Sequence, residues 1–192
     1  MTNQTNNINQ INQTNQINQI NHTNHINNTN HINQTNHTNH INKTAIITGA
    51  SRGIGAAIAK KLASCGYNLS LCCRNSSDRL KALADELHCA YGIEVLCYTG
   101  NVGDFFFAKD MVTNTISHFG HIDVLINNAG ISHIGLLSDM TPEEWNNIVA
   151  INLTGVFNFT KLVIPYMVAD KCGRILQISS VWGNVGASCE VA

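Results

Sequence analysis

Short apolar runs alternate with amphipathic segments along most of this chain. Runs rich in Ile, Leu and Val predict strands that are buried on both faces, as in a parallel sheet, and the segments between them have the apolar spacing of helices. The predicted strands are residues 44–47, 68–73, 93–98, 122–126 and 174–178. The predicted helices are residues 53–65, 104–119 and 141–169, and one that begins at residue 77. This alternation indicates an α/β fold, a doubly wound parallel sheet whose ligands bind beyond the carboxyl ends of its strands.

The predicted helix ends have local signals. Gly66 and Gly120 follow apolar stripes and are expected to end two helices, since glycine readily takes the left-handed backbone of a helix end. Ser77 is placed to cap the second helix. Thr141 precedes Pro142 and Glu144, so a helix is expected to start here with a capping box.

Residues 1–42 follow a different pattern. From Asn3 to Asn42 every third residue is Asn, and no charged side chain occurs before Lys43. A period of three matches neither a helix nor a strand, and the isoleucines are too sparse for a core. We therefore predict a disordered, Asn-rich low-complexity tail over residues 1–42 and one domain over residues 43–192. A triangular solenoid is the alternative.

Two sharper interpretations of the tail have little support. Asn-x-Thr is a glycosylation acceptor, but no charged and then apolar leader precedes it to direct secretion. Five histidines have neither carboxylates nor thiolates around them, so no metal site is predicted. They are His22, His25, His31, His37 and His40.

Composition excludes several classes of function. The formal net charge is −1 and no basic patch occurs, so nucleic acid is not an expected partner. No apolar run reaches the length of a membrane span, so no membrane partner is expected. The seven cysteines include no C-x-x-C pair, and most lie among apolar residues. We expect buried thiols in a reducing cytoplasm, not disulfides or a zinc site.

The first predicted strand is followed by a glycine-rich turn, Thr48-Gly-Ala-Ser-Arg-Gly-Ile-Gly55, that opens a helix. Backbone N–H groups and the positive end of the helix dipole converge there, which suits a phosphate group. Gly49 is expected to allow a sharp reversal, Gly53 to let a pyrophosphate come close, and Gly55 to let the helix pack on the strand. The turn predicts a dinucleotide site.

The next strand ends support this prediction. In a dinucleotide fold the second strand ends at the adenosine ribose, where an acidic residue would favour NAD. Here it ends at Cys73 and Arg74, with Arg52 nearby in the turn. Two guanidinium groups suit a 2′-phosphate, so we predict NADP as the cofactor. The alternative is that Arg74 is an ordinary solvated arginine.

Polar residues also follow the other strands. Asn101 follows the third strand and could bond an adenine edge or simply form a turn. The fourth strand ends in Asn127-Asn-Ala-Gly130, whose small residues would let a sugar and a flat ring lie against the backbone.

Two further polar residues are candidates. Asn152 shares an apolar helix face with Trp145 and Ile148, so we expect a buried, hydrogen-bonded amide, either functional or simply structural. Ser180, after the fifth strand, could bond a substrate carbonyl or cap a turn.

Together these motifs resemble the short-chain dehydrogenase/reductase family over residues 43–192. The resemblance rests on the glycine turn, Asn127-Asn-Ala-Gly130, Asn152 and Ile178-Ser-Ser-Val-Trp-Gly183, at family spacing and order. Within the family the chain looks most like 3-oxoacyl-(acyl-carrier-protein) reductases. It also resembles a reductase of the 5-aminopentanone modification of elongation factor P, which the run 186–191 fits somewhat better.

The resemblance implies a Rossmann-type fold and NADPH-dependent reduction of a small-molecule or carrier-bound carbonyl, with homo-oligomeric full-length relatives. Ser180 would polarise the carbonyl, and Asn152 would help to hold a water that relays protons. The implied NADP-binding residues are Gly49, Ser51, Arg52, Gly53, Ile54, Gly55, Arg74, Asn101, Val102, Asn128, Ala129 and Gly130. Asn101 departs from the aspartate more usual at its position, so the adenine contact is less well defined.

The family's Tyr-x-x-x-Lys segment would begin just after Ala192. In the family its tyrosine gives the proton to the carbonyl oxygen, and its lysine lowers the pKa of that tyrosine. We therefore expect the chain as given to be the front part of a reductase and to reduce carbonyls negligibly. A non-catalytic dinucleotide-binding fragment is the non-enzyme alternative. A hydrolase is a second enzyme class, because residues 49–53 also spell G-x-S-x-G around Ser51. It would need Asp123 and His133 as partners.

Overall fold

The computed structural model describes residues 42–183 and 185. The predicted tail, apart from Asn42, lies outside these residues, as do Cys189 and the run 186–191. The described residues belong to one compact unit, residues 41–192.

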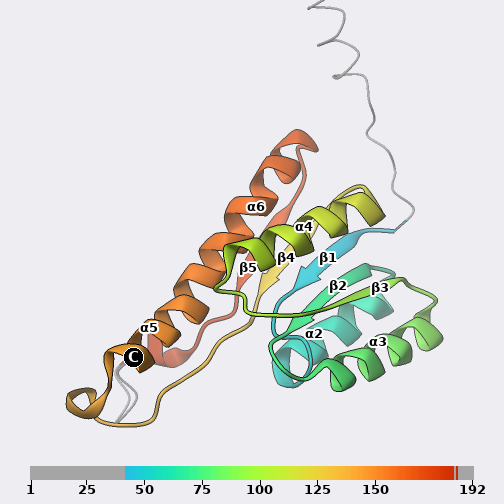
Figure 1. Cartoon of the computed structure of the whole chain (residues 1–192). Helices are drawn as coiled ribbons and strands as arrows, with labels where there is room; N and C mark the ends of the chain where they lie inside the picture. Colours follow the sequence, from blue (N-terminus) through green and yellow to red (C-terminus); the bar gives the residue numbers. More distant parts are fainter. Residues whose placement is uncertain (1–41, 184, 186–192) are drawn as a thin grey trace, which may run out of the picture. The chain divides into compact units, whose positions relative to one another are not determined.

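Strands and helices alternate along the described chain, as predicted (Figure 1). The strands are β1 Thr44–Ile47, β2 Asn68–Cys73, β3 Val95–Thr99, β4 Val124–Asn127 and β5 Arg174–Gln177. The α-helices are α2 Gly53–Ser64, α3 Ser77–Tyr91, α4 Phe105–Phe119, α5 Pro142–Val149 and α6 Gly155–Ala169. Short helical segments are η1 Leu137–Asp139, η2 Ala150–Thr154 and η3 Val181–Gly183.

The strands form one parallel sheet in the order β3-β2-β1-β4-β5. Ile46 in β1 lies opposite Ser70 in β2 and Leu125 in β4, so β1 is central. The strand order reverses on either side of β1, which opens a crevice at the carboxyl ends of β1 and β4. The predicted doubly wound α/β fold is thus confirmed.

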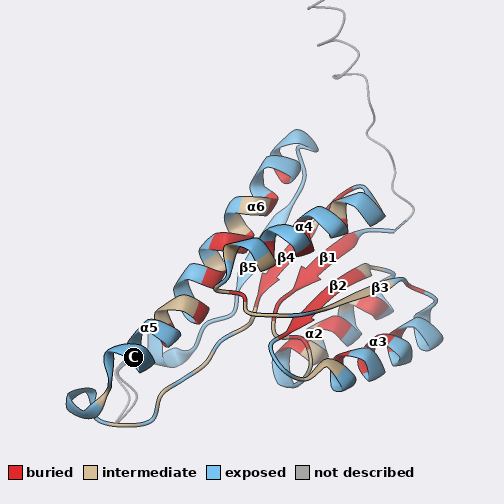
Figure 2. Ribbon diagram, viewed as in Figure 1, coloured by how far each residue is buried: buried red, intermediate tan, exposed pale blue. Residues whose placement is uncertain are grey.

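Alternating side chains of the sheet build two apolar cores. Residues such as Ala45 and Ile47 pack with α2 and α3, whereas Ile46 and Leu125 pack on the opposite face with α4 and α6. Figure 2 shows that β1, β2 and β4 are buried, while β5 is largely exposed. The expectation of a sheet covered on both faces therefore fits the central strands and is wrong for β5 among the described residues.

Most predicted helix ends are confirmed. Gly66, which follows the C-cap of α2, and Gly120, the C-cap of α4, take positive φ angles of 80° and 83°. Thr141 and Glu144 form the capping box of α5. The prediction for Ser77 is wrong by one residue, because Ser76 is the N-cap of α3 and its side chain makes no capping bond.

The predicted helix over residues 141–169 is one continuous helix with a π turn inside it. α5 passes through η2, a π-helical segment, into α6. At 28 residues it is long and apolar enough to cross a membrane, which corrects the expectation that no apolar run has that length. One such helix is weak evidence, since core helices pass the same test, and Phe159 and Val163 here are completely buried against the sheet.

The six described cysteines are all free thiols. Cys72 and Cys73 are buried in β2 as predicted, and Cys97 is half-buried. The prediction of buried thiols is wrong for Cys65, Cys89 and Cys172, which are exposed. Cys65 and Cys172 follow the ends of α2 and α6, and Cys89 lies in the last turn of α3. At such places an apolar neighbourhood in sequence does not imply a core position.

Candidate functional site: a dinucleotide-sized pocket

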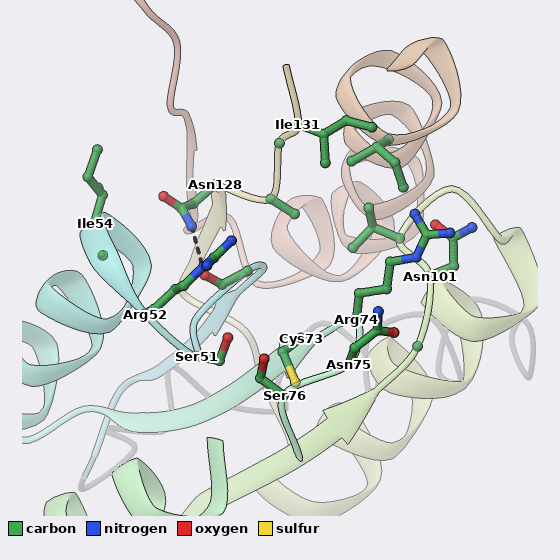
Figure 3. A pocket seen from close by; sticks show the side chains of 17 residues that line it. Ser51, Arg52, Ile54, Cys73, Arg74, Asn75, Ser76, Asn101, Asn128 and Ile131 are labelled. Atoms are coloured by element: carbon green, nitrogen blue, oxygen red, sulfur yellow. Dashed lines mark hydrogen bonds between the residues drawn. The ribbon is translucent and has the colours of Figure 1, made fainter. Parts of the chain in front are cut away.

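A pocket of about 500 Å³ lies beyond the carboxyl ends of β1 to β4 (Figure 3). Every residue for which the sequence predicted cofactor binding lines it, except Gly55. The predicted residues that line it are Gly49, Ser51, Arg52, Gly53, Ile54, Arg74, Asn101, Val102, Asn128, Ala129 and Gly130. Four chain segments that are distant in sequence therefore meet at one cavity.

The three glycines of the first turn have the properties expected of them. Gly49 has a φ of 66°, and a Cβ there would come within 2.9 Å of the Cα of Ala129. A Cβ on Gly55 would lie 2.5 Å from the carbonyl oxygen of Gly49, so only glycine allows the helix to pack this closely. Gly53 has a φ of 57°, and nothing lies within 4 Å of the place its Cβ would take. The backbone at Gly53 is therefore open to an approaching group.

The amino end of α2 faces this open backbone. Arg52 is the N-cap, its side chain makes no capping bond, and the first turn of α2 contains no acidic residue. The first N–H groups of a helix have no partner within the helix, and the helix dipole places partial positive charge there. The turn is thus suited to hold an anionic group such as a pyrophosphate.

The end of β4 is fastened to the glycine turn by two side chains. The Thr48 hydroxyl accepts the backbone N–H groups of Asn128 and Ala129, each at 3.0 Å. The Asn128 amide donates to the carbonyl oxygens of Thr48 at 2.9 Å and Gly49 at 3.1 Å. These four hydrogen bonds fix the distance between the two walls of the pocket.

The charge of the pocket is positive. Arg52 and Arg74 are lining residues, and none of the 17 lining residues is acidic. Figure 3 shows the two side chains on different sides of the pocket, with Arg74 directed toward Asn101. Arg74 Nη1 donates to the Oδ1 of Asn147 in α5 at 3.4 Å. The structure therefore places both guanidinium groups at the pocket, although they do not converge on one point.

Asn101 and Val102 form the wall that follows β3. Asn101 Oδ1 accepts the backbone N–H of Gly103 at 3.0 Å, so this oxygen stabilises its own turn. A ligand can then be met by the Asn101 NH₂ group, which donates only. Asn101 is thus a turn residue that also lines the pocket, and its contact with an adenine edge stays a prediction.

The expectation that Asn152 is buried is wrong. It lies in η2 with an exposed side chain, and Trp145, on the same predicted face, is 47% exposed. Its amide pairs with the backbone of Ile131, accepting the N–H at 2.9 Å and donating to the carbonyl at 2.8 Å. The π turn shifts the helical phase, so the 3.6-residue spacing used for the prediction does not hold at this position.

Ser180 lies after β5 and directly before the short helix η3. Its hydroxyl accepts the backbone N–H of Trp182 at 3.3 Å, so it acts as a turn cap in this structure. Neither Ser180 nor Asn152 is among the pocket-lining residues.

The hydrolase alternative is not supported by the geometry. Ser51 lines the pocket, but Asp123 lies at the amino ends of β1 and β4, away from the pocket, where its carboxylate accepts the N–H of Thr44 at 2.8 Å. His133 Nδ1 lies 3.8 Å from the carboxylate of Glu144. The three residues of the supposed triad do not come together.

Sequence reasoning missed several lining residues. Asn75, Ser76, Gly100 and Ile131 lie within two residues of predicted residues, so extending each strand-end motif would have found them. Ile151 has no such signal, because it reaches the pocket from the π turn.

Comparison with known proteins identifies the family of this chain. The family model for short chain dehydrogenase matches residues 43–192. A 3-oxoacyl-(acyl-carrier-protein) reductase FabG of Staphylococcus epidermidis is 40% identical over 143 residues, covering 74% of this chain and 58% of the relative. A D-beta-hydroxybutyrate dehydrogenase of Cupriavidus necator is 38% identical over 145 residues, 76% of this chain and 55% of the relative. The chain thus spans little more than half the length of these relatives.

Two solved structures share the fold. A metagenomic short-chain oxidoreductase in complex with NADP has a TM-score of 0.73 and 36% identity, covering 77% of this chain and 66% of that one. An alcohol dehydrogenase from the archaeon Thermococcus sibiricus, complexed with 5-hydroxy-NADP, has a TM-score of 0.72 and 33% identity, covering 77% and 62%. The glycine turn, the fastened end of β4 and these matches lead to one conclusion: the chain belongs to the short-chain dehydrogenase family.

Proposed function

We propose that the pocket binds NADP(H) and that the chain supplies the dinucleotide-binding part of a carbonyl reductase. One observation carries this proposal: the uncapped helix end at Gly53 and two arginines line the same pocket, and no lining residue of that pocket is acidic. The pyrophosphate would lie at the turn 49–55, and Arg52 and Arg74 would attract the 2′-phosphate. The NADP and 5-hydroxy-NADP bound by the two solved neighbours support this proposal.

The proposed substrate is a 3-oxoacyl thioester or a related small or carrier-bound carbonyl compound, reduced in the cytoplasm by a self-associating enzyme. Its support is the resemblance to the reductases named above. The elongation factor P alternative rested on residues 186–191, which lie outside the described residues, so no structural observation favours it.

When bound, NADPH supplies a hydride. The chain's own residues would position the reactants: Gly130 and Ile131 form the wall at the end of β4, and Asn152 holds Ile131 in place. Both polar atoms of the Asn152 amide bond to Ile131, so we propose that Asn152 acts by fixing this loop. Ser180 would polarise the substrate carbonyl with its hydroxyl hydrogen, which stays free to donate while the oxygen accepts the Trp182 N–H.

Binding tests the proposal directly. NADPH and NADH are titrated into the polypeptide of residues 1–192, and binding is measured by calorimetry and by the fluorescence of Trp145 and Trp182. We expect NADPH to bind more tightly, and Arg74→Ala to weaken NADPH about tenfold with little effect on NADH, the cost of a charge-assisted hydrogen bond. Arg79→Ala, an exposed arginine in α3, is the matched control.

The outcomes separate the parts of the proposal. Equal affinity for both dinucleotides, unaffected by Arg74→Ala, would remove the preference for NADP. Failure to bind either dinucleotide would remove the proposal as a whole. We expect negligible reduction of a 3-oxoacyl thioester by residues 1–192, because the resemblance places the proton donor after Ala192. Turnover at a normal enzymatic rate would contradict that assignment of the donor.

A further inference from the structure

The long helix formed by α5, η2 and α6 contacts the pocket walls through three asparagines. Asn147 bonds to Arg74, Asn152 to the backbone of Ile131, and Asn158 to the turn that follows β3. Each asparagine comes from a different segment of this helix, so one continuous element touches three separate walls. π turns of the kind seen in η2 occur often near functional sites.

Asn158 holds the turn that follows β3 and lines the pocket. It is 2% exposed, and its NH₂ group donates to the carbonyl oxygens of Val102 and Gly103, each at 3.2 Å. The backbones come close at the same place, since a Cβ on Gly103 would lie 2.7 Å from the carbonyl oxygen of Ala150. A buried amide with both its hydrogens on one turn leaves that turn little freedom.

Asn147 holds Arg74 in a different way. Both side chains are exposed, and the 3.4 Å hydrogen bond uses only one of the five N–H groups of the guanidinium. The remaining donors stay available to a ligand while the bond restricts where the side chain can go. A free arginine loses considerable rotamer freedom on binding, so a partner that limits this freedom in advance favours binding.

We propose that the helix shapes the adenosine half of the pocket through these two tethers. Asn147 is then a positioning residue for the 2′-phosphate, through Arg74, and Asn158 is a positioning residue for the adenine, through residues 101–103. This inference rests on the proposed binding of NADP(H). The two tethers differ in their expected specificity, since Arg74 meets only ligands that carry a 2′-phosphate whereas the turn meets every adenosine ligand.

The first test uses Asn147→Ala, with Asn146→Ala as the matched control on the same exposed part of α5. Calorimetry gives the Kd of NADPH, NADH, 2′,5′-ADP and ADP for residues 1–192. We expect Asn147→Ala to raise the Kd of NADPH and 2′,5′-ADP about threefold to tenfold and to leave NADH and ADP unchanged. In the Arg74→Ala background it should have no further effect. An equal change for all four ligands, or none, would overturn this tether.

The second test uses Asn158→Leu and Gly103→Ala, which disturb the same turn by different means. We expect both to raise the Kd of all four ligands by similar factors, about tenfold where two hydrogen bonds are lost. Val163→Ala, a fully buried change further along α6, should lower the Tm and leave every Kd unchanged. If Asn158→Leu does not fold, Gly103→Ala still decides. A lower Tm with unchanged Kd values for the folded variants would overturn the tether.

Failure of this inference differs from failure of the proposed function. If the unmodified chain binds neither NADPH nor NADH, the proposed function itself is wrong. If it binds NADPH and Arg74→Ala weakens that binding while the asparagine and Gly103 variants change nothing, the function stands and only the tethers are refuted.

Discussion

Thr48 offers the sharpest test of how the pocket is held together. The residue is 2% exposed, and its hydroxyl oxygen accepts two backbone N–H groups, those of Asn128 and Ala129. Thr48→Val replaces the hydroxyl with a methyl group of nearly equal size. The substitution therefore removes an acceptor from two backbone donors without creating a cavity.

The expected cost follows from the two donors left without a partner. An unsatisfied buried donor costs about 1–3 kcal/mol, and these N–H groups are only part-buried, so we use about 1 kcal/mol for each. The variant should then lose about 2 kcal/mol of unfolding free energy. For a domain of this size each kcal/mol lowers the Tm by about 2–4 °C, so a fall of about 4–8 °C is expected.

Thermal unfolding monitored by circular dichroism measures this change, and NADPH titration measures its effect on the pocket. Thr48→Ser is the matched control, because it keeps the hydroxyl and loses only a methyl group. We expect the serine variant to retain most of the NADPH affinity. The valine variant should lose more NADPH affinity than its fall in Tm accounts for. A valine variant as stable as the serine variant, with the same Kd, would refute the reasoning about this hydroxyl.

Three further predictions concern other parts of the fold. Gly55→Ala should lower both Tm and NADPH affinity in calorimetric and thermal assays, because its Cβ would meet the Gly49 carbonyl at 2.5 Å. The Thr141 N–H holds the pKa of Glu144 below its usual value. The stability that this carboxylate adds is therefore complete above the pKa of Glu144 in the unfolded chain, and it is lost as the pH falls through the pKa in the folded protein. The Tm of the wild type should be higher than that of Glu144→Gln at pH 7, and the two Tm values should converge in acid. Burial raises the pKa of Cys72 to about 12, so a thiol reagent at pH 8 should leave it unmodified in native protein, as mass spectrometry of labelled peptides would show. The thiols expected to react first are Cys65, Cys89 and Cys172.

The sequence predicted the sheet and the first wall of the pocket because their signals are local. Apolar runs such as residues 44–47 need burial whatever surrounds them, and each became a strand within a residue or two of its predicted ends. A glycine turn is likewise defined by steric limits within a few residues. Gly49 and Gly53 both have the positive φ angles that glycine takes at little steric cost.

Features that depend on contacts between distant segments could not be predicted in this way. The expected burial of Asn152 assumed a regular 3.6-residue period, which the π turn at Ala150–Thr154 breaks. The bond between Arg74 and Asn147 joins residues that lie 73 positions apart, and no local pattern signals it. The exposure of Cys172 depends on what packs beyond α6, which its apolar neighbours in sequence do not reveal.

The hydrogen bonds around the pocket differ in how firmly they hold each wall. Thr48 and Asn158 are almost completely buried, so the walls at the ends of β4 and β3 are fixed before any ligand arrives. Arg74 is exposed and held by one long bond, so it still has to be ordered on binding. The glycine turn and the walls at the ends of β3 and β4 should therefore contribute similar affinity for NADPH and NADH, while the choice between them depends on Arg74. Discrimination between the two cofactors is thus the property that substitutions near Arg74 should change most easily without loss of the fold.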